Sequence, residues 1–329
     1  MKRPLVVKLG SGLVVDDRGR PRRAVLRQRA EEIAATVGAG TSVCVVSSGA
    51  IALGLAGARK PVSLPRLQAA SALGQVALQR AWQDALRPHG LDAAQMLLTS
   101  AEIGDRRAYV NIRAAFNALF ALGAVPVVNE NDATATDEIS FGDNDALAAQ
   151  VAVLLRARLL VLLTSVPGVL REGVLIEDGR DARTAVFGPG SPLGRGGMES
   201  KVAAAELAAG AGIPTVIAGD TPLSELVASG GTRFAPTGEL PAFKLWLRHG
   251  KRIVGRIVVD DGARRALVDA GASLLAVGIT DVEGSFRAGD GVELVGPDGT
   301  AFARGVASVD AADLAPGVEA VHRDRLVLL

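Results

Sequence analysis

Short apolar runs alternate with helical stretches along much of the chain, and this alternation restricts the fold strongly. The runs are rich in Val and Leu and contain no acidic residue. They are residues 4–9, 43–46, 93–98, 124–128, 159–163 and 213–217. Runs of this kind are typical of strands buried on both faces, and helices between them favour a parallel sheet that is covered on both sides. The sequence therefore predicts an α/β three-layer sandwich with a mostly parallel central sheet.

The pattern changes after about residue 235. Pro, Gly and polar residues follow one another closely from 236 to 241, which is typical of a linker. Beyond it, Asp-Gly, Gly-Asp and Pro-Asp-Gly turns separate short apolar runs at 253–259, 274–277, 292–295 and 304–306. We therefore expect a large α/β domain over 1–235, a linker over 236–250 and a small β-rich domain over 251–329.

Charge and composition exclude several classes of protein. Lys and Arg number 36 and Asp and Glu 35 among 329 residues, a formal net charge of +1, so no global field favours nucleic acid or an anionic membrane. The single cysteine, Cys44, can form no internal disulfide, and its place in an apolar run predicts a buried thiol. His89, His249 and His322 are far apart and no Cys-His spacing exists, so the sequence offers no zinc site.

No segment is predicted to enter a membrane or to direct secretion. Residues 33–58 are uncharged and longer than the ~20 residues of a membrane helix, but glycines and hydroxyl residues interrupt them. A helix end, a strand, a glycine loop and a new helix account for this stretch better. Lys8 interrupts the N-terminal apolar run too early for a signal peptide. We therefore expect a cytoplasmic protein.

Carboxylates and carboxamides are concentrated directly behind the apolar run 124–128. They lie in Asn129–Ala133 and in Phe141–Ala146. Open α/β sheets usually bind ligands beyond the carboxyl ends of their strands, so these segments form a predicted binding site. Acceptors and donors together suit a small zwitterion, whose amino group needs carboxylates and whose carboxylate needs amide donors. The alternative is a turn-rich acidic loop in solvent, because Asn and Asp favour turns.

Two glycine-containing turns follow the first two predicted strands. Gly10-Ser11-Gly12 comes shortly after Lys8, and its glycines let backbone N–H groups approach an anion. Ser48 and Gly49 follow the second strand where a helix opens, and the unsatisfied N–H groups there also favour an anion. Both turns have plainer interpretations, since Lys8 can be an edge residue and Ser48 an ordinary N-cap.

A third glycine-rich segment, Gly194–Lys201, precedes the alanine-rich helix predicted from Val202 to Ala209. Its spacing differs from G-x-x-x-x-G-K-[ST], which disfavours a P-loop NTPase. The helix dipole disfavours a lysine in the first turn, so Lys201 favours an anionic partner over a solvated surface position. Thr164–Gly168 forms another loop at the carboxyl end of a predicted strand.

Five segments stand in an order that is specific: Val7–Ser11, Ser47–Ile51, Asn129–Ala133, Gly142–Asp145 and Gly194–Lys201. In this order they resemble the glutamate 5-kinases of the amino acid kinase family. The tail from about Lys251 resembles a PUA domain through Arg256–Ala263 and Gly271–Leu275. The resemblance implies ATP-dependent phosphorylation of the γ-carboxylate of L-glutamate, the first step towards proline, with Mg²⁺.

The resemblance also implies roles for individual residues. Lys8 and Lys201 would reach the transferring phosphoryl group and Asp145 would orient them, which agrees with the electrostatic needs of phosphoryl transfer. The residues implied on the glutamate side are Ser48, Gly49, Asn129, Asp132, Asp143 and Asn144. The residues implied on the nucleotide side are Lys8, Gly10, Thr164, Ser165, Arg195, Gly196, Gly197, Met198 and Lys201.

Some positions depart from the pattern of that family. Thr164-Ser165 stands where Thr-Asp is usual, which removes a carboxylate near the adenine and ribose side. Arg195 and Ser200 each stand where threonine is common, and the segment from Val169 to Gly194 is shorter than expected. Both lysines and Asp145 are intact, so we expect an active enzyme.

Two alternatives stay open at this point. One is another kinase of the same family, acting on N-acetylglutamate, aspartate or a phosphate monoester, although the doubled Asn/Asp cluster and the β-rich tail argue against it. The other is an RNA-binding protein, since PUA domains elsewhere bind RNA and the tail carries Lys251, Arg252, Arg264 and Arg265. The scarcity of aromatic residues for base stacking argues against that alternative. By resemblance, a dimer or tetramer and feedback inhibition by proline are also expected.

Overall fold

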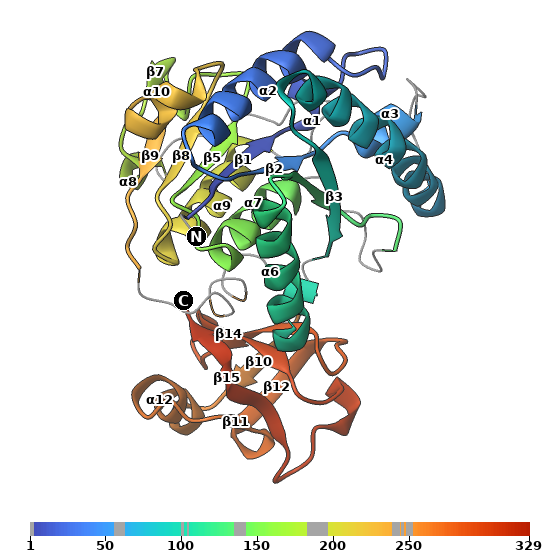
Figure 1. Cartoon of the computed structure of the whole chain (residues 1–329). Coiled ribbons are helices and arrows are strands. Elements are labelled where there is room, and N and C mark those ends of the chain that lie inside the picture. Colours follow the sequence, from blue (N-terminus) through green and yellow to red (C-terminus); the bar gives the residue numbers. More distant parts are fainter. Residues whose placement is uncertain are drawn as a thin grey trace. The chain divides into compact units, whose positions relative to one another are not determined.

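The computed structural model describes residues 3–55, 63–99, 102–103, 105–134, 143–182, 197–238, 244, 247 and 253–329. The chain divides into two compact units, Met1–Glu239 and Leu240–Leu329 (Figure 1). The division lies within the stretch 236–250 that was predicted as a linker. Each unit has its own sheet and its own apolar core.

A mostly parallel sheet forms the centre of the first unit. Its strand order within the described residues is β3-β4-β2-β1-β5-β8-β9, in which β9 runs antiparallel to β8 and the other pairs are parallel. The strands are β1 (Leu5–Leu9), β2 (Val43–Ser47), β3 (Ala93–Leu98), β4 (Val125–Glu130), β5 (Leu159–Leu163), β8 (Thr215–Ala218) and β9 (Thr232–Phe234). The apolar runs of the sequence form the parallel strands, so the predicted mostly parallel sheet is confirmed.

Helices cover both faces of this sheet and complete the predicted three layers (Figure 1). One layer contains α2 (Arg23–Gly38), α4 (Leu64–Leu86) and α10 (Leu223–Ala228), with α3 (Ala50–Leu55) packed on α4. The other layer contains α6 (Arg106–Ala121), α7 (Asp143–Leu154) and α9 (Met198–Gly210). Shorter elements are α1 (Ser11–Val14), η1 (Arg87–His89), β6 (Leu170–Arg171), β7 (Val174–Leu175) and α8 (Gly179–Ala182). Within the described residues, no helix has the length and apolar character needed to cross a bilayer.

The pleat of β1 sends its side chains alternately to the two helical layers. Leu5, Val7 and Leu9 belong to the apolar core that includes α2 and α4, where Trp82 is fully buried. Lys8 therefore points to the opposite face, which α7 and α9 cover. A strand buried on both sides thus places one lysine in the interior, where Lys8 is only 4% exposed.

α3 and α4 cross so closely that the contact requires two glycines. A Cβ atom at Gly54 would lie 1.8 Å from the carbonyl oxygen of Ala70, and one at Gly74 would lie 1.8 Å from the carbonyl oxygen of Ala50. No side chain fits at either position, because backbone atoms cannot move aside as the end of a flexible side chain can. α4 is thereby fixed against α3, which begins directly after Gly49.

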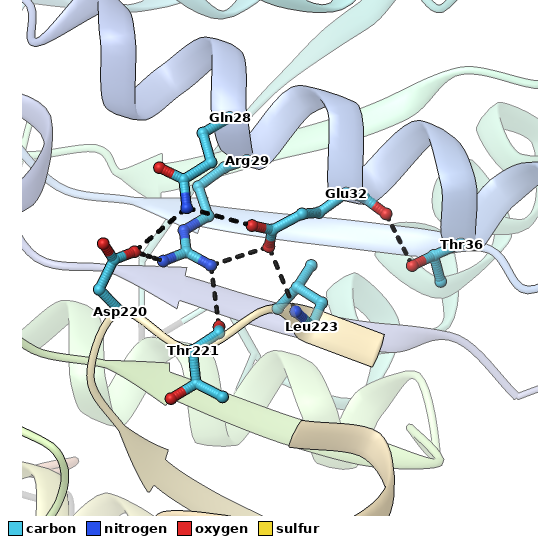
Figure 2. A network of polar contacts seen from close by, with 7 residues as sticks. All are labelled: Gln28, Arg29, Glu32, Thr36, Asp220, Thr221 and Leu223. Carbon is cyan, nitrogen blue, oxygen red and sulfur yellow. Dashed lines mark hydrogen bonds and ion pairs between the residues drawn. The ribbon is translucent and has the colours of Figure 1, made fainter. Parts of the chain in front are cut away.

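A buried arginine ties α2 to the chain that leaves β8 (Figure 2). Arg29 is 3% exposed, and its guanidinium forms ion pairs with Glu32 and Asp220. It also donates to the backbone oxygen of Thr221 at 3.1 Å, while the Glu32 carboxylate accepts from the backbone N–H of Leu223 at 3.2 Å. The start of α10 is therefore held against α2 by charge-assisted hydrogen bonds.

The second unit is β-rich, as predicted from its turns. Its sheet has the order β11-β15-β14-β13-β10-β12 within the described residues. The elements are β10 (Ile253–Val259), α12 (Asp261–Asp269), β11 (Leu274–Leu275), η2 (Ala276–Gly278), β12 (Ile279–Gly284), β13 (Gly291–Val295), β14 (Ala301–Ala307), η3 (Ala311–Asp313) and β15 (Glu319–Leu328). Side chains from the strands and from α12 form a separate core, in which Phe286 and Val321 are buried.

Candidate active site

The register of the parallel strands brings the predicted site loops to one edge of the sheet. Leu9, the last residue of β1, pairs with Ser47 of β2 and with Leu163 of β5. The turns that follow these three strands therefore begin at the same level. β4 is parallel to β2 and ends in Asn129 and Glu130. The carboxyl ends of parallel strands are the usual ligand site of such sheets.

Two lysines share one buried carboxylate near this edge. Lys8 of β1 places its ammonium nitrogen 2.6 Å from Oδ1 of Asp145, and Lys201 of α9 places its ammonium nitrogen 3.1 Å from Oδ2 of the same residue. Lys8, Asp145 and Lys201 are 4%, 0% and 6% exposed. Three residues that are far apart in the sequence thus form one buried cluster between β1, α7 and α9.

Burial and charge act in opposite directions on Asp145. Burial alone would raise the pKa of this carboxyl, but the two ammonium groups and a hydrogen bond from Ser200 (2.9 Å) hold its pKa below the ordinary value. Burial lowers the pKa of Lys8; Asp145 opposes this shift, and the positive charge of Lys201 adds to it. A single carboxylate that faces two buried ammonium groups creates surroundings that favour the approach of an anion.

Asp132, on the predicted glutamate side, lies two residues beyond β4 and is 8% exposed. Its Oδ2 accepts a hydrogen bond from the Ser71 hydroxyl of α4 at 3.0 Å. Burial raises the pKa of the Asp132 carboxyl, and the Ser71 hydroxyl acts against this shift. An inward-facing carboxylate at this position is suited to bind an ammonium group.

Two amide oxygens of the predicted substrate residues are buried without a hydrogen-bond partner among the described residues. They are Oδ1 of Asn129 in β4 and Oδ1 of Asn144 in the first turn of α7. A buried acceptor without a partner costs on the order of 1–3 kcal/mol. Each oxygen therefore favours a donor that arrives with a ligand. Asp143 begins the same helical turn.

The turns after β1 and β2 contact each other through the backbone. The N–H of Ser48 donates to the carbonyl oxygen of Leu9 at 3.0 Å. Gly49 has a φ of +116°, and a Cβ atom there would lie 2.9 Å from the nearest side chain, so the turn requires glycine. A Cβ atom at Gly10 would lie 3.7 Å from the Lys8 ammonium nitrogen, so this turn passes directly beside the lysine.

The predicted nucleotide-side residues are described in part. Thr164 and Ser165 follow β5, and the N–H of Thr164 donates to the last residue of β8 at 2.8 Å. Gly197 is the N-cap of α9 and Met198 is its first residue. Outside the described residues lie Arg195, Gly196 and the side chain of Asp143. The described members lie at the carboxyl end of β5 and at the N-terminus of α9, where Lys201 also lies.

Mg²⁺, which the resemblance implies, finds no cage of protein ligands in the described part of the chain. No three His, Cys, Asp or Glu side chains are grouped there in a way that could hold a metal ion. Asp145, the carboxylate of the lysine cluster, is engaged by both lysines. These residues fit an ion that arrives with nucleotide phosphates and keeps part of its water.

The contribution of α4 to this site was not predicted. The apolar spacing of its residues predicts a helix, yet Ser71 is 1% exposed and Gln75 is 7% exposed on the same helix. Ser71 bonds to Asp132, and Gln75 donates to the backbone oxygen of Glu130 at 3.3 Å. A Ser and a Gln four residues apart on a mostly apolar helix were the available signal in the sequence. Ser200, noted only as a departure from the family pattern, bonds to the Asp145 carboxylate.

Comparison with known families defines the class of this protein. A model described as the amino acid kinase family matches residues 3–219, and a PUA domain model matches residues 255–320. The first match contains the lysine cluster and covers more than half of the chain. The chain therefore belongs to the amino acid kinase family, and its tail is a PUA domain.

The particular relatives within this family are glutamate 5-kinases. The chain is 43% identical to the glutamate 5-kinase of Novosphingobium aromaticivorans, over 99% of this chain and 96% of the relative. It is 41% identical to the glutamate 5-kinase of Pseudomonas putida KT2440, over 98% of this chain and 97% of the relative. The resemblance predicted from the motifs is thereby confirmed. The first alignment spans 364 positions, so at least 35 of them (364 − 329) have no counterpart in this chain.

A solved structure shares the fold of the first unit. Carbamate kinase from Giardia lamblia, bound to AMP-PNP, aligns with 70% of this chain and 97% of its own length, at a TM-score of 0.51 and 18% identity. At that identity the likeness concerns the fold alone. It confirms the predicted amino acid kinase-like α/β architecture.

Proposed function

We propose that this protein transfers the γ-phosphoryl group of ATP to the γ-carboxylate of L-glutamate, forming L-glutamyl 5-phosphate and ADP. The observation that carries the proposal is the pair of lysines, Lys8 and Lys201, on the single buried carboxylate of Asp145. The identity of 41–43% to glutamate 5-kinases over nearly the whole chain supports the choice of substrate. The reaction would be the first step towards proline.

The acceptor carboxylate is already a nucleophile, so the transfer needs no general base. The enzyme must bring two anions together in line and stabilise negative charge on the transferring phosphoryl group. Lys8 lies near the carboxyl end of β1 and Lys201 in the first turn of α9, so positive charge approaches from two elements. Asp145 keeps the two ammonium groups in place on its two oxygens, which preorganises the site before the substrates bind.

On the glutamate side, the proposed contacts divide between the amino and carboxylate groups of the substrate. Asp132 would bind the α-ammonium group, with Asp143 assisting. The buried oxygens of Asn129 and Asn144 would accept hydrogen bonds from the same group. The Ser48 hydroxyl would donate to the substrate carboxylate. These contacts require both an amino and a carboxylate group on the substrate.

ATP would bind between the carboxyl end of β5 and the N-terminus of α9. The turns at Gly10, Gly49 and Gly197 would supply backbone N–H groups or clearance for the phosphates. The remaining proposed contacts are Thr164 and Ser165 towards the adenine and ribose, and Arg195, Gly196 and Met198 along the phosphates. Mg²⁺, when bound, would neutralise charge on those phosphates.

The test is an acceptor panel with purified protein, ATP and Mg²⁺. The acceptors are L-glutamate, N-acetyl-L-glutamate, L-aspartate, and bicarbonate with ammonia. ADP release reports turnover, and hydroxylamine converts an acyl phosphate into a hydroxamate that identifies the product. Hydroxamate that forms only with L-glutamate is the expected result. Turnover with another acceptor and none with glutamate would support a different kinase of the family, and no turnover with any acceptor would overturn the kinase proposal.

Three further properties stay predictions. Feedback inhibition by proline and assembly into a dimer or tetramer are predictions from the resemblance, whereas a cytoplasmic location is a prediction from the sequence alone. The same assay with added proline tests the first, and light scattering of the purified protein tests the second.

RNA binding by the PUA domain is a second candidate activity. One observation favours it: the Arg264 guanidinium lies 5.4 Å from the centre of the Phe302 ring, in a cleft of about 670 Å³ that Arg265 also lines. An arginine on an aromatic ring offers both charge and a stacking surface to a nucleotide. A gel shift of the full chain with single-stranded and hairpin RNA at several salt concentrations tests it. Binding that weakens with salt would support the activity, and no shift at low salt would exclude it for those RNAs.

A further inference from the structure

One face of α4 carries a polar side chain at every fourth position, and each of these side chains donates to a neighbouring strand end. Ser71 Oγ donates to Oδ2 of Asp132 at 3.0 Å, and Gln75 Nε2 donates to the backbone oxygen of Glu130 at 3.3 Å. Gln79 Nε2 donates to the backbone oxygen of the first residue of β3 at 2.6 Å. Four-residue spacing places all three donors on the same side of the helix.

The first two contacts fix the chain where it leaves β4. Glu130 is the last residue of β4 and Asp132 lies two residues further on, so α4 holds both the backbone and the carboxylate. Between them, the N–H of Asn131 donates to the last residue of β3 at 3.0 Å. Ser71 and Gln75 are buried, so water competes little for their hydrogen bonds.

The same helix also fixes the other half of the glutamate site. Gly74 packs on the carbonyl oxygen of Ala50, the first residue of α3, and a Cβ atom at Gly74 would lie 1.8 Å from that oxygen. α3 follows directly after Ser48 and Gly49. Backbone contact therefore sets the spacing of α3 and α4, and α4 is a common support for the Ser48 turn and for Asp132.

We propose that Ser71 is a positioning residue of the glutamate site, whose hydroxyl keeps Asp132 ionised and directed at the substrate's α-ammonium group. The inference rests on the proposed function, in which Asp132 binds that group. A carboxylate that pairs with an ammonium group must be ionised, and burial favours its protonated form. Ser71 acts through Asp132 and has no direct contact with substrate in this scheme.

The test compares Ser71→Ala and Ser71→Cys with Gln79→Ala, by measuring kcat and KM for glutamate and for ATP between pH 5.5 and 8. Loss of a hydrogen bond to a charged group should raise the KM for glutamate by about tenfold in Ser71→Ala, with the KM for ATP nearly unchanged. Without the hydroxyl the pKa of Asp132 rises, so the KM for glutamate should increase on the acidic side at a higher pH than in the wild type. Gln79→Ala removes a hydrogen bond that the same helix makes two turns away from Ser71, so its kinetic constants should match those of the wild type.

Ser71→Cys separates positioning from packing. A thiol is somewhat larger than the hydroxyl, so it leaves no cavity, but it donates weakly; this variant should therefore resemble Ser71→Ala if the hydrogen bond matters. Thermal unfolding of each variant confirms that it is folded; if Ser71→Ala fails to fold, the cysteine variant still decides. If the folded variants keep the wild-type KM for glutamate and its wild-type dependence on acidic pH, this inference is wrong, while the proposed function is unaffected. Absence of glutamate-dependent turnover in the wild type would overturn the proposed function, and this inference with it.

Discussion

Lys8 occupies a position that the centre of a parallel sheet normally gives to an apolar side chain. Its ammonium group is buried at a cost of several kcal/mol, and the ion pair with Asp145 offsets part of this cost. Removal of one partner of a buried ion pair is destabilising mainly because it leaves the other charge uncompensated, and Lys201 would still compensate Asp145 if Lys8 were replaced. A lysine at this position therefore serves the reaction more than the fold.

Lys8→Met should therefore affect turnover much more than stability. Asp145 would keep its contact with Lys201, so the loss in the free energy of unfolding should stay below the roughly 3–5 kcal/mol expected for an uncompensated buried charge. Turnover should fall by roughly 100-fold or more, because one of two charges at the phosphoryl group is lost. Chemical unfolding and the hydroxamate assay measure the two effects. Lys244→Met in the second unit is the matched control, and near-normal turnover of Lys8→Met would contradict the two-lysine mechanism.

The pH dependence of turnover should report the burial of Lys8. Burial lowers the pKa of this lysine from its ordinary 10.5, so the positive charge is lost at a lower pH than in a solvated lysine. The value of kcat/KM for ATP, measured at saturating glutamate, should therefore fall on the alkaline side before pH 10.5 is reached. A profile at saturating Mg²⁺ between pH 7 and 10.5 checks this expectation, and a flat profile up to 10.5 would mean that Lys8 stays charged.

At the scale of elements, apolar runs predicted the sheet well because a strand covered on both faces needs an uncharged sequence. Polar segments were harder to interpret. Asn and Asp suit helix starts as well as turns, so their presence does not separate the two. In the structure, Asn144 and Asp145 lie in the first turn of α7. α12 was missed since Asp261-Gly262 looks like a turn, although Asp260 caps the helix by accepting from the N–H of Ala263 at 2.7 Å. The cluster of Lys8, Asp145 and Lys201 depends on tertiary packing that spacing in the sequence does not encode.

The crossing of α3 and α4 predicts the effect of Gly74→Ala. The added methyl group would overlap the carbonyl oxygen of Ala50, so the helices must separate. We expect a loss of roughly 1–3 kcal/mol in the free energy of unfolding, as for other overpacked cores. The glutamate KM should also rise, because α3 carries the Ser48 turn. Gly38→Ala, at the end of α2, is the matched control: a Cβ atom there meets nothing within 4 Å, so unfolding should be unchanged or slightly harder. Equal stability of the two variants would contradict the claim that α3 and α4 cross too closely for a side chain at position 74.

At the scale of the whole molecule, the site and the tail belong to different units. The described site residues lie in Met1–Glu239, and the PUA domain has a core of its own. The sequence predicted this division, because the alternation of strands and helices stops near residue 235 and short apolar runs separated by Asp-Gly turns follow. The sequence did not predict what the tail does. In the structure, no described side chain of the tail belongs to the lysine cluster.

A chain that ends at Glu239 should therefore fold and keep glutamate-dependent turnover within about tenfold of the full chain, as expected for an independent domain. Circular dichroism and the hydroxamate assay measure both properties. A shorter chain that ends at Ala218 loses α10 and β9, together with Asp220 and Thr221, two of the partners of Arg29, and should fail to fold. A folded but inactive chain ending at Glu239 would show that the PUA domain takes part in catalysis.

The glycine contact between α3 and α4 also affects how a saturation library of this enzyme would be interpreted. In a growth selection for the enzyme's product, positions 54 and 74 would tolerate almost no substitution, because each Cβ atom meets a backbone oxygen at 1.8 Å. Their tolerance scores would match those of Lys8 or Asp145, although the two glycines only set a distance between helices. A map of intolerant positions would therefore outline the active site together with the scaffold that holds it, and measurement of protein abundance for each variant would separate the two.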